Sequence, residues 1–152
     1  MPVHTERRVL PFTPRALFDL VADIDRYPEF LPWCLAARIR SHQDNIVIAD
    51  LVIGHRLIRE RFTSRVKLTG PESENAEGRI DVEYIEGPMQ HMSNRWIFHP
   101  VAPNSTEIDF HVDFAFRSKM LEKLMGLVFH EAVTRMVRAF ETRARKILTP
   151  SA

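Results

Sequence analysis

The chain contains little cysteine and glycine and carries no strong excess of charge. Cys34 is the single cysteine among 152 residues, so neither an intrachain disulfide nor a cysteine-rich zinc site can form. The five glycines make no Gly-x-Gly-x-x-Gly and no phosphate-cradling loop. The 21 basic and 20 acidic residues leave a formal charge of +1, whereas duplex DNA binding usually needs a basic surface. We therefore expect no DNA partner, no metal and no catalytic cofactor.

Long hydrophobic runs are absent as well. The longest uncharged apolar stretch covers residues 124–129, far below the ~18 residues of a membrane-spanning helix. The first residues are charged and proline-broken, unlike a secretory signal. Together with the lone thiol, this predicts a cytoplasmic protein, with any membrane contact peripheral and at the inner face. A hydrophobic content of 45% with 27% charged residues is typical of one globular domain, expected over residues 1–152.

Hydropathy patterning predicts an α+β fold. In the last predicted strand Ile108, Phe110, Val112 and Phe114 alternate with polar residues, which gives the sheet one dry face. An apolar stripe of nearly 30 residues near the end of the chain predicts a long helix that must cover that face. The predicted elements are a strand over 3–10, a helix over 14–22, a structured loop over 25–34, an antiparallel meander over 36–117 and a helix over 118–148.

The chain shows no complete catalytic motif. His130 and Glu131 begin a string like that of zinc proteases, but Thr134 stands where the second histidine is needed. Cys34 is expected to be a buried and inert thiol. Glu60 shares the strand parity of inward residues, yet an exposed carboxylate beyond the core edge is the simpler interpretation.

The predicted final helix is basic, with seven basic residues against three acidic ones. Arg135, Arg138, Arg143 and Arg145 could face an anionic partner such as RNA or a lipid headgroup. The alternative is that these cations favour the carboxyl-terminal end of the helix dipole and keep the surface soluble.

Several segments resemble the coenzyme Q-binding branch of the START-like, polyketide cyclase superfamily. The most specific are DRYPEFLPWC at 25–34 and the strand-to-helix junction at 114–118; TPRALFDLVADI at 13–24, NRWIFHP at 94–100 and the run at 110–144 extend the match over nearly the whole chain. The resemblance implies a helix-grip fold, in which a curved antiparallel sheet of about seven strands wraps around the long C-terminal helix and leaves an apolar tunnel.

The resemblance also implies a function. Its first form is a non-enzymatic carrier or chaperone that holds ubiquinone (coenzyme Q) or a polyprenyl precursor and supports respiratory electron transport. One alternative is a toxin-like protein that binds the large ribosomal subunit and blocks subunit association. A second is a polyketide cyclase or hydratase in which Glu60, Tyr84 or His91 acts as acid or base. The inward positions of the strands and the helix stripe predict the ligand-binding wall as Phe62, Val66, Trp96, Phe98, Phe110, Val112, Phe114, Leu124, Val128, Ala132 and Met136.

Overall fold

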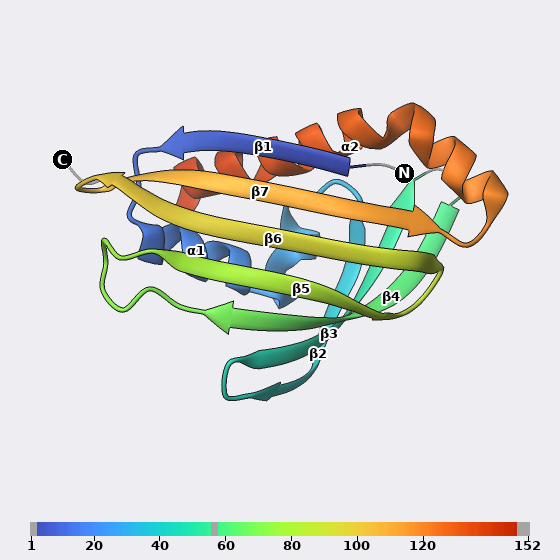
Figure 1. Cartoon of the computed structure of the whole chain (residues 1–152), viewed down its shortest axis with the longest axis horizontal. Coiled ribbons are helices and arrows are strands. Elements are labelled where there is room, and N and C mark those ends of the chain that lie inside the picture. The colour runs from blue at the N-terminus through green and yellow to red at the C-terminus, as the bar shows by residue number, and fades with distance from the viewer. Residues whose placement is uncertain (1–2, 56–57, 149–152) are drawn as a thin grey trace.

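Seven strands form one antiparallel sheet in the computed structural model, which describes residues 3–55 and 58–148. The strand order is β1-β7-β6-β5-β4-β3-β2, so the two edges of the sheet are β1 and β2. Figure 1 shows the sheet curling strongly, with β2, β3 and β4 crossing behind the other strands. The strands are β1 (Val3–Leu10), β2 (Cys34–Gln43), β3 (Ile46–His55), β4 (Ile58–Thr69), β5 (Gly78–Glu86), β6 (Met89–Ala102) and β7 (Ser105–Phe116).

Three helical segments complete the chain. Helix α1 (Pro14–Ala22) and the 3-10 helix η1 (Ile24–Glu29) lie between β1 and β2, and α2 (Lys119–Ile147) closes the chain. In Figure 1 the second half of α2 passes behind β1 and β7 on the inner side of the curled sheet, and its first half extends past the end of β1. This arrangement confirms the predicted α+β, helix-grip fold with seven strands around a long terminal helix.

Both α-helices begin at a residue whose side-chain hydroxyl caps the first turn. The Thr13 hydroxyl accepts the Ala16 N–H at 3.1 Å, and proline occupies the first position of α1. The Ser118 hydroxyl accepts the Leu121 N–H at 3.3 Å at the start of α2. Ser118 is two residues past the end of β7, so the cap sets where the chain leaves the sheet.

Two of the turns between strands contain short polar residues in a left-handed backbone conformation, and a third contains glycine. Asp44 and Asn104 adopt positive φ angles of 54° and 61°, which these short polar side chains tolerate better than most. Gly87 has a φ of 145° between β5 and β6. A Cβ added there would lie 2.7 Å from the Cβ of Phe62, so this turn requires glycine.

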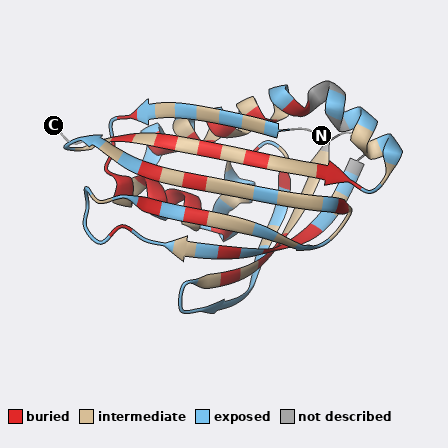
Figure 2. Ribbon diagram, in the orientation of Figure 1, coloured by how far each residue is buried: buried red, intermediate tan, exposed pale blue. Residues whose placement is uncertain are grey.

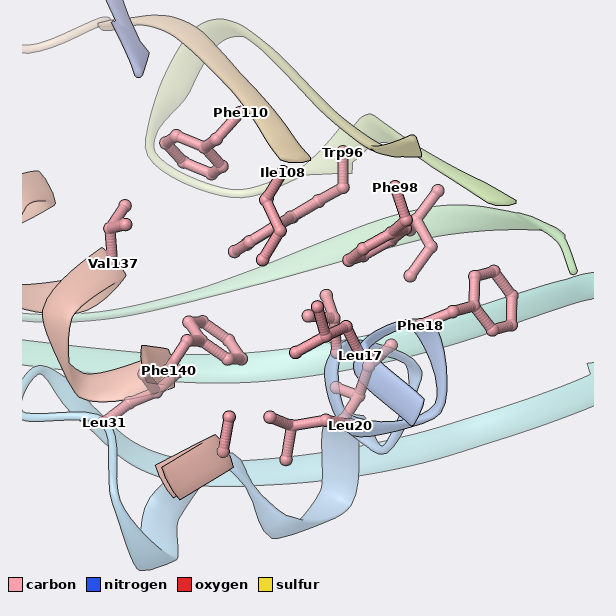
Figure 3. Packing of buried hydrophobic residues seen from close by; sticks show 14 of the residues in the cluster. Leu17, Phe18, Leu20, Leu31, Trp96, Phe98, Ile108, Phe110, Val137 and Phe140 are labelled. Atoms are coloured by element: carbon pink, nitrogen blue, oxygen red, sulfur yellow. The ribbon is translucent and has the colours of Figure 1, made fainter. Parts of the chain in front are cut away.

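The core lies between the sheet, α1 and the second half of α2. Figure 2 shows buried residues alternating along β7, as expected of a strand with one covered face. In Figure 3 Val137 and Phe140 of α2 face Trp96 and Phe110 of the sheet. The Trp96 and Phe110 rings meet edge to face with centroids 4.6 Å apart, a favoured aromatic geometry.

The inner face of β1 is polar, which the hydropathy pattern did not predict. Glu6 lies between His4 and Arg8 and bonds to both, and Arg8 also donates to Glu141 of α2 at 2.8 Å. The pKa of Glu6 is lowered: burial opposes ionisation, but the hydrogen bonds from Arg8 and His4 outweigh it. Inward charges on an edge strand discourage pairing with the edge of another sheet.

Two local predictions need correction. The loop predicted over 25–34 overlaps the six-residue helix η1 (Ile24–Glu29), which has Pro28 inside it. Among the described side chains of α2 the buried ones are Phe129, Val133, Val137, Phe140 and Ala144, so Leu124 and Ala132 are not the buried positions that the sequence predicted. Phe129 takes the contact with Phe114 of β7, their ring centroids 4.9 Å apart. Leu124 then lies roughly 140° away around the helix, at 3.6 residues per turn, and is 42% exposed.

Candidate functional site

A largely apolar cavity of about 190 Å³ lies between the inner face of the sheet, the η1 region and α2. The sheet contributes Ala49, Leu51, Ile53, Phe62, Ser64, Val66, Ile80, Val82, Met92, Asn94, Trp96, Phe110 and Val112. The remaining wall consists of Val21, Ile24, Tyr27, Leu31, Pro32, Trp33, Cys34, Met136 and Phe140. The cavity thus occupies the place where the resemblance put an apolar tunnel.

The structure brings six of the predicted wall residues together around this cavity. They share inward positions on β4, β6, β7 and α2, and they are Phe62, Val66, Trp96, Phe110, Val112 and Met136. The placement of the five strand residues follows from strand alternation, because residues two apart point to the same face. Their role in binding a ligand stays a prediction.

Four of the other five predicted wall residues are described and do not line the cavity. Phe98 is fully buried under α1, its ring 6.0 Å from that of Phe18. Phe114 packs between Phe116 and Phe129. Three predicted residues remain on α2: Leu124 is exposed, Ala132 is half-buried without lining the cavity, and the side chain of Val128 lies outside what the structure describes. Because Phe129 of α2 packs against β7, Leu124 and Ala132 do not face the cavity.

The proline-rich segment after α1 supplies part of the wall that strand and helix periodicity could not predict. Tyr27 and Phe30 pack edge to face against Phe140 of α2, with centroids 5.4 and 5.2 Å away. Arg143 donates to Glu29 at 2.9 Å and lies over the Phe30 ring, 5.1 Å from its centroid. These contacts fasten η1 to α2 and close one side of the cavity.

Three polar groups of the wall are already hydrogen-bonded. Asn94 donates to the His111 carbonyl at 2.8 Å and accepts the Trp96 indole N–H at 3.1 Å. The Tyr27 hydroxyl donates to the Val21 carbonyl, and burial raises the pKa of this phenol. The Cys34 thiol donates to the Ala36 carbonyl at 3.5 Å, and burial raises its pKa to about 11. At neutral pH the cavity is therefore lined by uncharged groups.

Ser64 differs from these groups. It lies on β4 between Phe62 and Val66, is 2% exposed and lines the cavity. Its hydroxyl finds no hydrogen-bond partner within the described part of the chain. The sequence contained a signal for this site that the analysis of hydropathy missed. Ser64 is a polar residue in an otherwise apolar row of inward positions on β4, and Asn94 is another on β6.

The candidate acid and base residues do not form a catalytic group at the cavity. Glu60, Tyr84 and His91 are all absent from its lining. The Tyr84 hydroxyl accepts the Met89 N–H at 3.0 Å, and His91 lies 3.1 Å from Asp113 on the neighbouring strand. Over residues 3–55 and 58–148, no three His, Cys, Asp or Glu side chains are grouped to hold a metal ion.

Most of the candidate arginines on α2 are engaged within the protein. Arg135 pairs with Glu131 at 2.9 Å, Arg143 with Glu29 at 2.9 Å and Arg145 with Glu141 at 3.4 Å. Arg138 is exposed and makes no ion pair with any described residue. None of the described helices is long and apolar enough to cross a bilayer.

Comparison with known proteins places the chain in one family. The model of the family described as polyketide cyclase / dehydrase and lipid transport matches residues 10–141. The chain is 41% identical to the ribosome association toxin RatA of Rickettsia prowazekii, over 95% of this chain and 96% of that protein. It is 29% identical to the mitochondrial coenzyme Q-binding protein COQ10 homolog B of Xenopus laevis, over 95% and 58%.

Similarity to solved structures supports the fold. The crystal structure of the Zhui aromatase/cyclase from Streptomyces sp. R1128 superimposes with a TM-score of 0.82. The match covers 97% of this chain and 96% of that one at 15% sequence identity. At that identity the likeness concerns the fold alone.

Proposed function

Because this chain belongs to the polyketide cyclase / dehydrase and lipid transport family, we propose that it binds a hydrophobic lipid in the cavity between sheet and α2. The proposed ligand is ubiquinone or a polyprenyl precursor, and the proposed role is that of a carrier or chaperone in respiratory electron transport. No enzymatic step is proposed, since Glu60, Tyr84 and His91 all lie off the cavity wall. The name of the COQ10 homologue supports this choice of ligand.

The observation that carries the proposal is the cavity of about 190 Å³. By analogy with truncated cores, leaving such a volume empty costs up to about 5 kcal/mol at ~24 cal/mol per Å³. Water is a poor filler, because a buried water needs two to four polar partners and most of the wall is apolar. Each methylene of a lipid buried there contributes roughly 0.8 kcal/mol.

The size of the cavity limits what it can enclose. An engineered apolar cavity of about 150 Å³ takes up one benzene, so this slightly larger one holds a single substituted ring and a short piece of chain. A long polyprenyl tail must therefore continue out of the cavity. Pro32 is exposed at the cavity wall, which makes this segment the proposed exit.

Two experiments test the proposal. Protein purified from a quinone-producing host is extracted with organic solvent, and the extract is examined by mass spectrometry for a co-purifying quinone. Short-tailed ubiquinone is then titrated against the purified protein. Trp33 and Trp96 both line the cavity, so their fluorescence should be quenched as the quinone binds. Lipid-free protein that also leaves added quinone unbound would overturn the proposal.

A second candidate function is association with the ribosome. It is supported by the name of the Rickettsia relative and by the exposed Arg135 and Arg138 on the outer face of α2. RNA binding should fall steeply with salt, because cations are released from the phosphates. Co-sedimentation with large ribosomal subunits tests it directly.

The variant for that test changes both arginines, Arg135→Glu with Arg138→Glu. Its matched control changes Arg61→Glu with Lys67→Glu, two exposed residues of β4 with the same total change of charge. Loss of sedimentation in the first variant alone supports a ribosomal role. Wild-type protein that stays in the supernatant at low salt excludes it.

Peripheral contact with a membrane is a further part of the proposal. At the start of α2, Met120 is 69% and Leu124 42% exposed. They are four residues apart and so lie on one side of the helix, with exposed Lys119 and Lys123 beside them. Exposed apolar groups beside cations are the features of a helix that rests on an anionic lipid surface.

A further inference from the structure

The Ser64 hydroxyl is a buried polar group that makes no hydrogen bond with the described residues of the fold. Its neighbours along the inner face of β4 are Phe62 and Val66, and all three line the cavity. Ser64 is 2% exposed, and no described residue lies within hydrogen-bonding reach of its oxygen. Buried polar groups in folded proteins almost always have a partner, so this exception requires an explanation.

The other polar groups of the wall bond elsewhere, and none of them forms a hydrogen bond with the Ser64 hydroxyl. Both functional ends of the Asn94 amide are engaged, one with His111 and the other with Trp96. The Tyr27 hydroxyl and the Cys34 thiol each donate to a backbone carbonyl. Ser64 therefore differs from these groups, because its hydroxyl lines the cavity and bonds to none of the described residues.

Packing alone does not favour serine at this position. An alanine would fill nearly the same space on the inner face of β4 without burying an unpaired hydroxyl. The unmade hydrogen bond destabilises the empty protein, and sites that sacrifice stability in this way are commonly binding sites. A ligand atom that accepts a hydrogen bond would remove the penalty.

We propose that Ser64 is the polar anchor of the ligand site and donates a hydrogen bond to an oxygen on the ligand's ring. The inference rests on the proposed lipid-binding function and adds the residue that holds the ligand's ring and the orientation of the ligand. The ligand is an oxygen-bearing ring, such as a quinone, joined to an apolar chain. The ring oxygen lies inward at β4, and the chain leaves past the exposed Pro32.

The test compares two ligands and two variants. The ligands are a short-tailed ubiquinone and a hydrocarbon with the same tail on a ring that lacks oxygen. The variants are Ser64→Ala and the control Ser93→Ala, which changes an exposed serine of β6. Binding is measured by quenching or by calorimetry, and thermal unfolding is followed for each protein without ligand.

The proposal predicts opposite effects on binding and stability. Ser64→Ala should weaken ubiquinone binding about fivefold to tenfold, the loss of one hydrogen bond. Its affinity for the hydrocarbon should change less than twofold. Without ligand, the same variant should melt about 2–4 °C higher, as expected for relief of an unmet hydrogen bond in a chain of this size. Ser93→Ala should change none of these quantities.

The possible outcomes distinguish the proposed role of Ser64 from the proposed lipid-binding function. If Ser64→Ala binds the quinone as tightly as the wild type, the anchor is wrong and the lipid-binding function stands. Equal weakening for quinone and hydrocarbon would also overturn the anchor, because the loss would then be one of packing. If neither ligand binds the wild-type protein, the proposed function fails and the anchor fails with it.

Discussion

The ring of Phe140 on α2 lies edge-on to the indole of Trp96 on β6, with centroids 5.0 Å apart and planes at 71°. Both residues line the cavity, and Phe140 also contacts Tyr27 and Phe30 from the η1 region. One aromatic side chain thus joins the helix, the sheet and the proline-rich segment. The wall of the proposed ligand site and the packing of the core depend on the same contact.

Replacing Phe140 should therefore destabilise the protein and open the cavity. Phe140→Ala is expected to lower the free energy of unfolding by about 3–5 kcal/mol, the usual cost of removing a buried phenylalanine. Denaturant unfolding measures the change. Arg138→Ala, an exposed residue of the same helix, serves as control and should alter stability by less than about 0.5 kcal/mol. Equal effects of the two substitutions would contradict the packing described.

Two glycines should respond in opposite ways to alanine. At Gly87 the φ of 145° and the contact of an added Cβ with Phe62 predict a loss of about 1–3 kcal/mol or more. At Gly126 in α2 an added Cβ meets no described atom within 4 Å. Gly126→Ala should raise stability by about 0.5–1 kcal/mol through its helix propensity. Thermal unfolding of both variants checks the signs, and stabilisation by Gly87→Ala would refute this turn geometry.

The buried thiol should be slow to react. With a pKa of about 11, about one Cys34 side chain in a thousand is a thiolate at pH 8, against about one in four for an unperturbed cysteine. Alkylation of the native protein should be about a hundredfold slower than that of the unfolded protein. Added quinone should slow it further, because Cys34 lines the cavity. Native labelling as fast as unfolded labelling would show that the thiol is accessible.

The same shift makes stability depend on pH. Cys34 holds its proton to a higher pH in the folded protein, where its pKa is about 11, than in the unfolded chain, where it is about 8.5. Its contribution to stability is therefore complete below about pH 8.5 and declines as the pH rises toward the folded value. Cys34→Ala should remove this part of the decline when unfolding is measured between pH 8 and pH 11. A parallel decline in wild type and variant would assign the effect to other groups.

Filling the cavity should block the ligand without disrupting the fold. Ala49 is 1% exposed on β3 and lines the cavity, so the ring in Ala49→Phe would occupy the proposed site. We expect quinone affinity to fall at least tenfold, with a stability change within the ~1–3 kcal/mol usual for overpacking. Ala102→Phe, at the exposed end of β6, is the control. Unchanged affinity in a folded Ala49→Phe protein would place the ligand elsewhere.

The first turns of α2 should govern contact with lipid. Met120→Gln combined with Leu124→Gln removes two exposed apolar side chains and leaves the charge unchanged. Co-sedimentation with vesicles that contain anionic lipid should then decrease several-fold, while zwitterionic vesicles should bind neither protein well. Val101→Gln, an exposed apolar residue of β6, is the control. Sedimentation that persists in the double variant would remove this helix from the contact.

The sequence predicted the strands and their inward faces well because alternation over long strands specifies a face without knowledge of the partners. Phe62, Val66, Trp96, Phe110 and Val112 all line the cavity for this reason. The helix was harder to orient. Leu124, Val128 and Phe129 are all apolar, so the sequence allows several faces of α2 to be buried. The contact between Phe129 and Phe114 determines which face packs on the sheet.

Other parts of the site depend on tertiary contacts that no local pattern encodes. Tyr27 reaches the wall because Phe140 packs against it, across a long separation in sequence. The inward placement of Ser64 could have been deduced from its parity with Phe62. Its lack of a partner could not, because that depends on which polar groups of neighbouring strands are already engaged.

The two edges of the sheet, β1 and β2, are not paired with each other within the described residues. A closed barrel could admit a bulky guest only by breaking the ladder between two strands. Here α2 spans the opening through side-chain contacts, such as those of Phe140 and Arg143 with the η1 region. Movement of the helix away from the sheet would widen the cavity and leave every strand pairing intact, so loading and release of the proposed ligand would require no local unfolding of the β-structure.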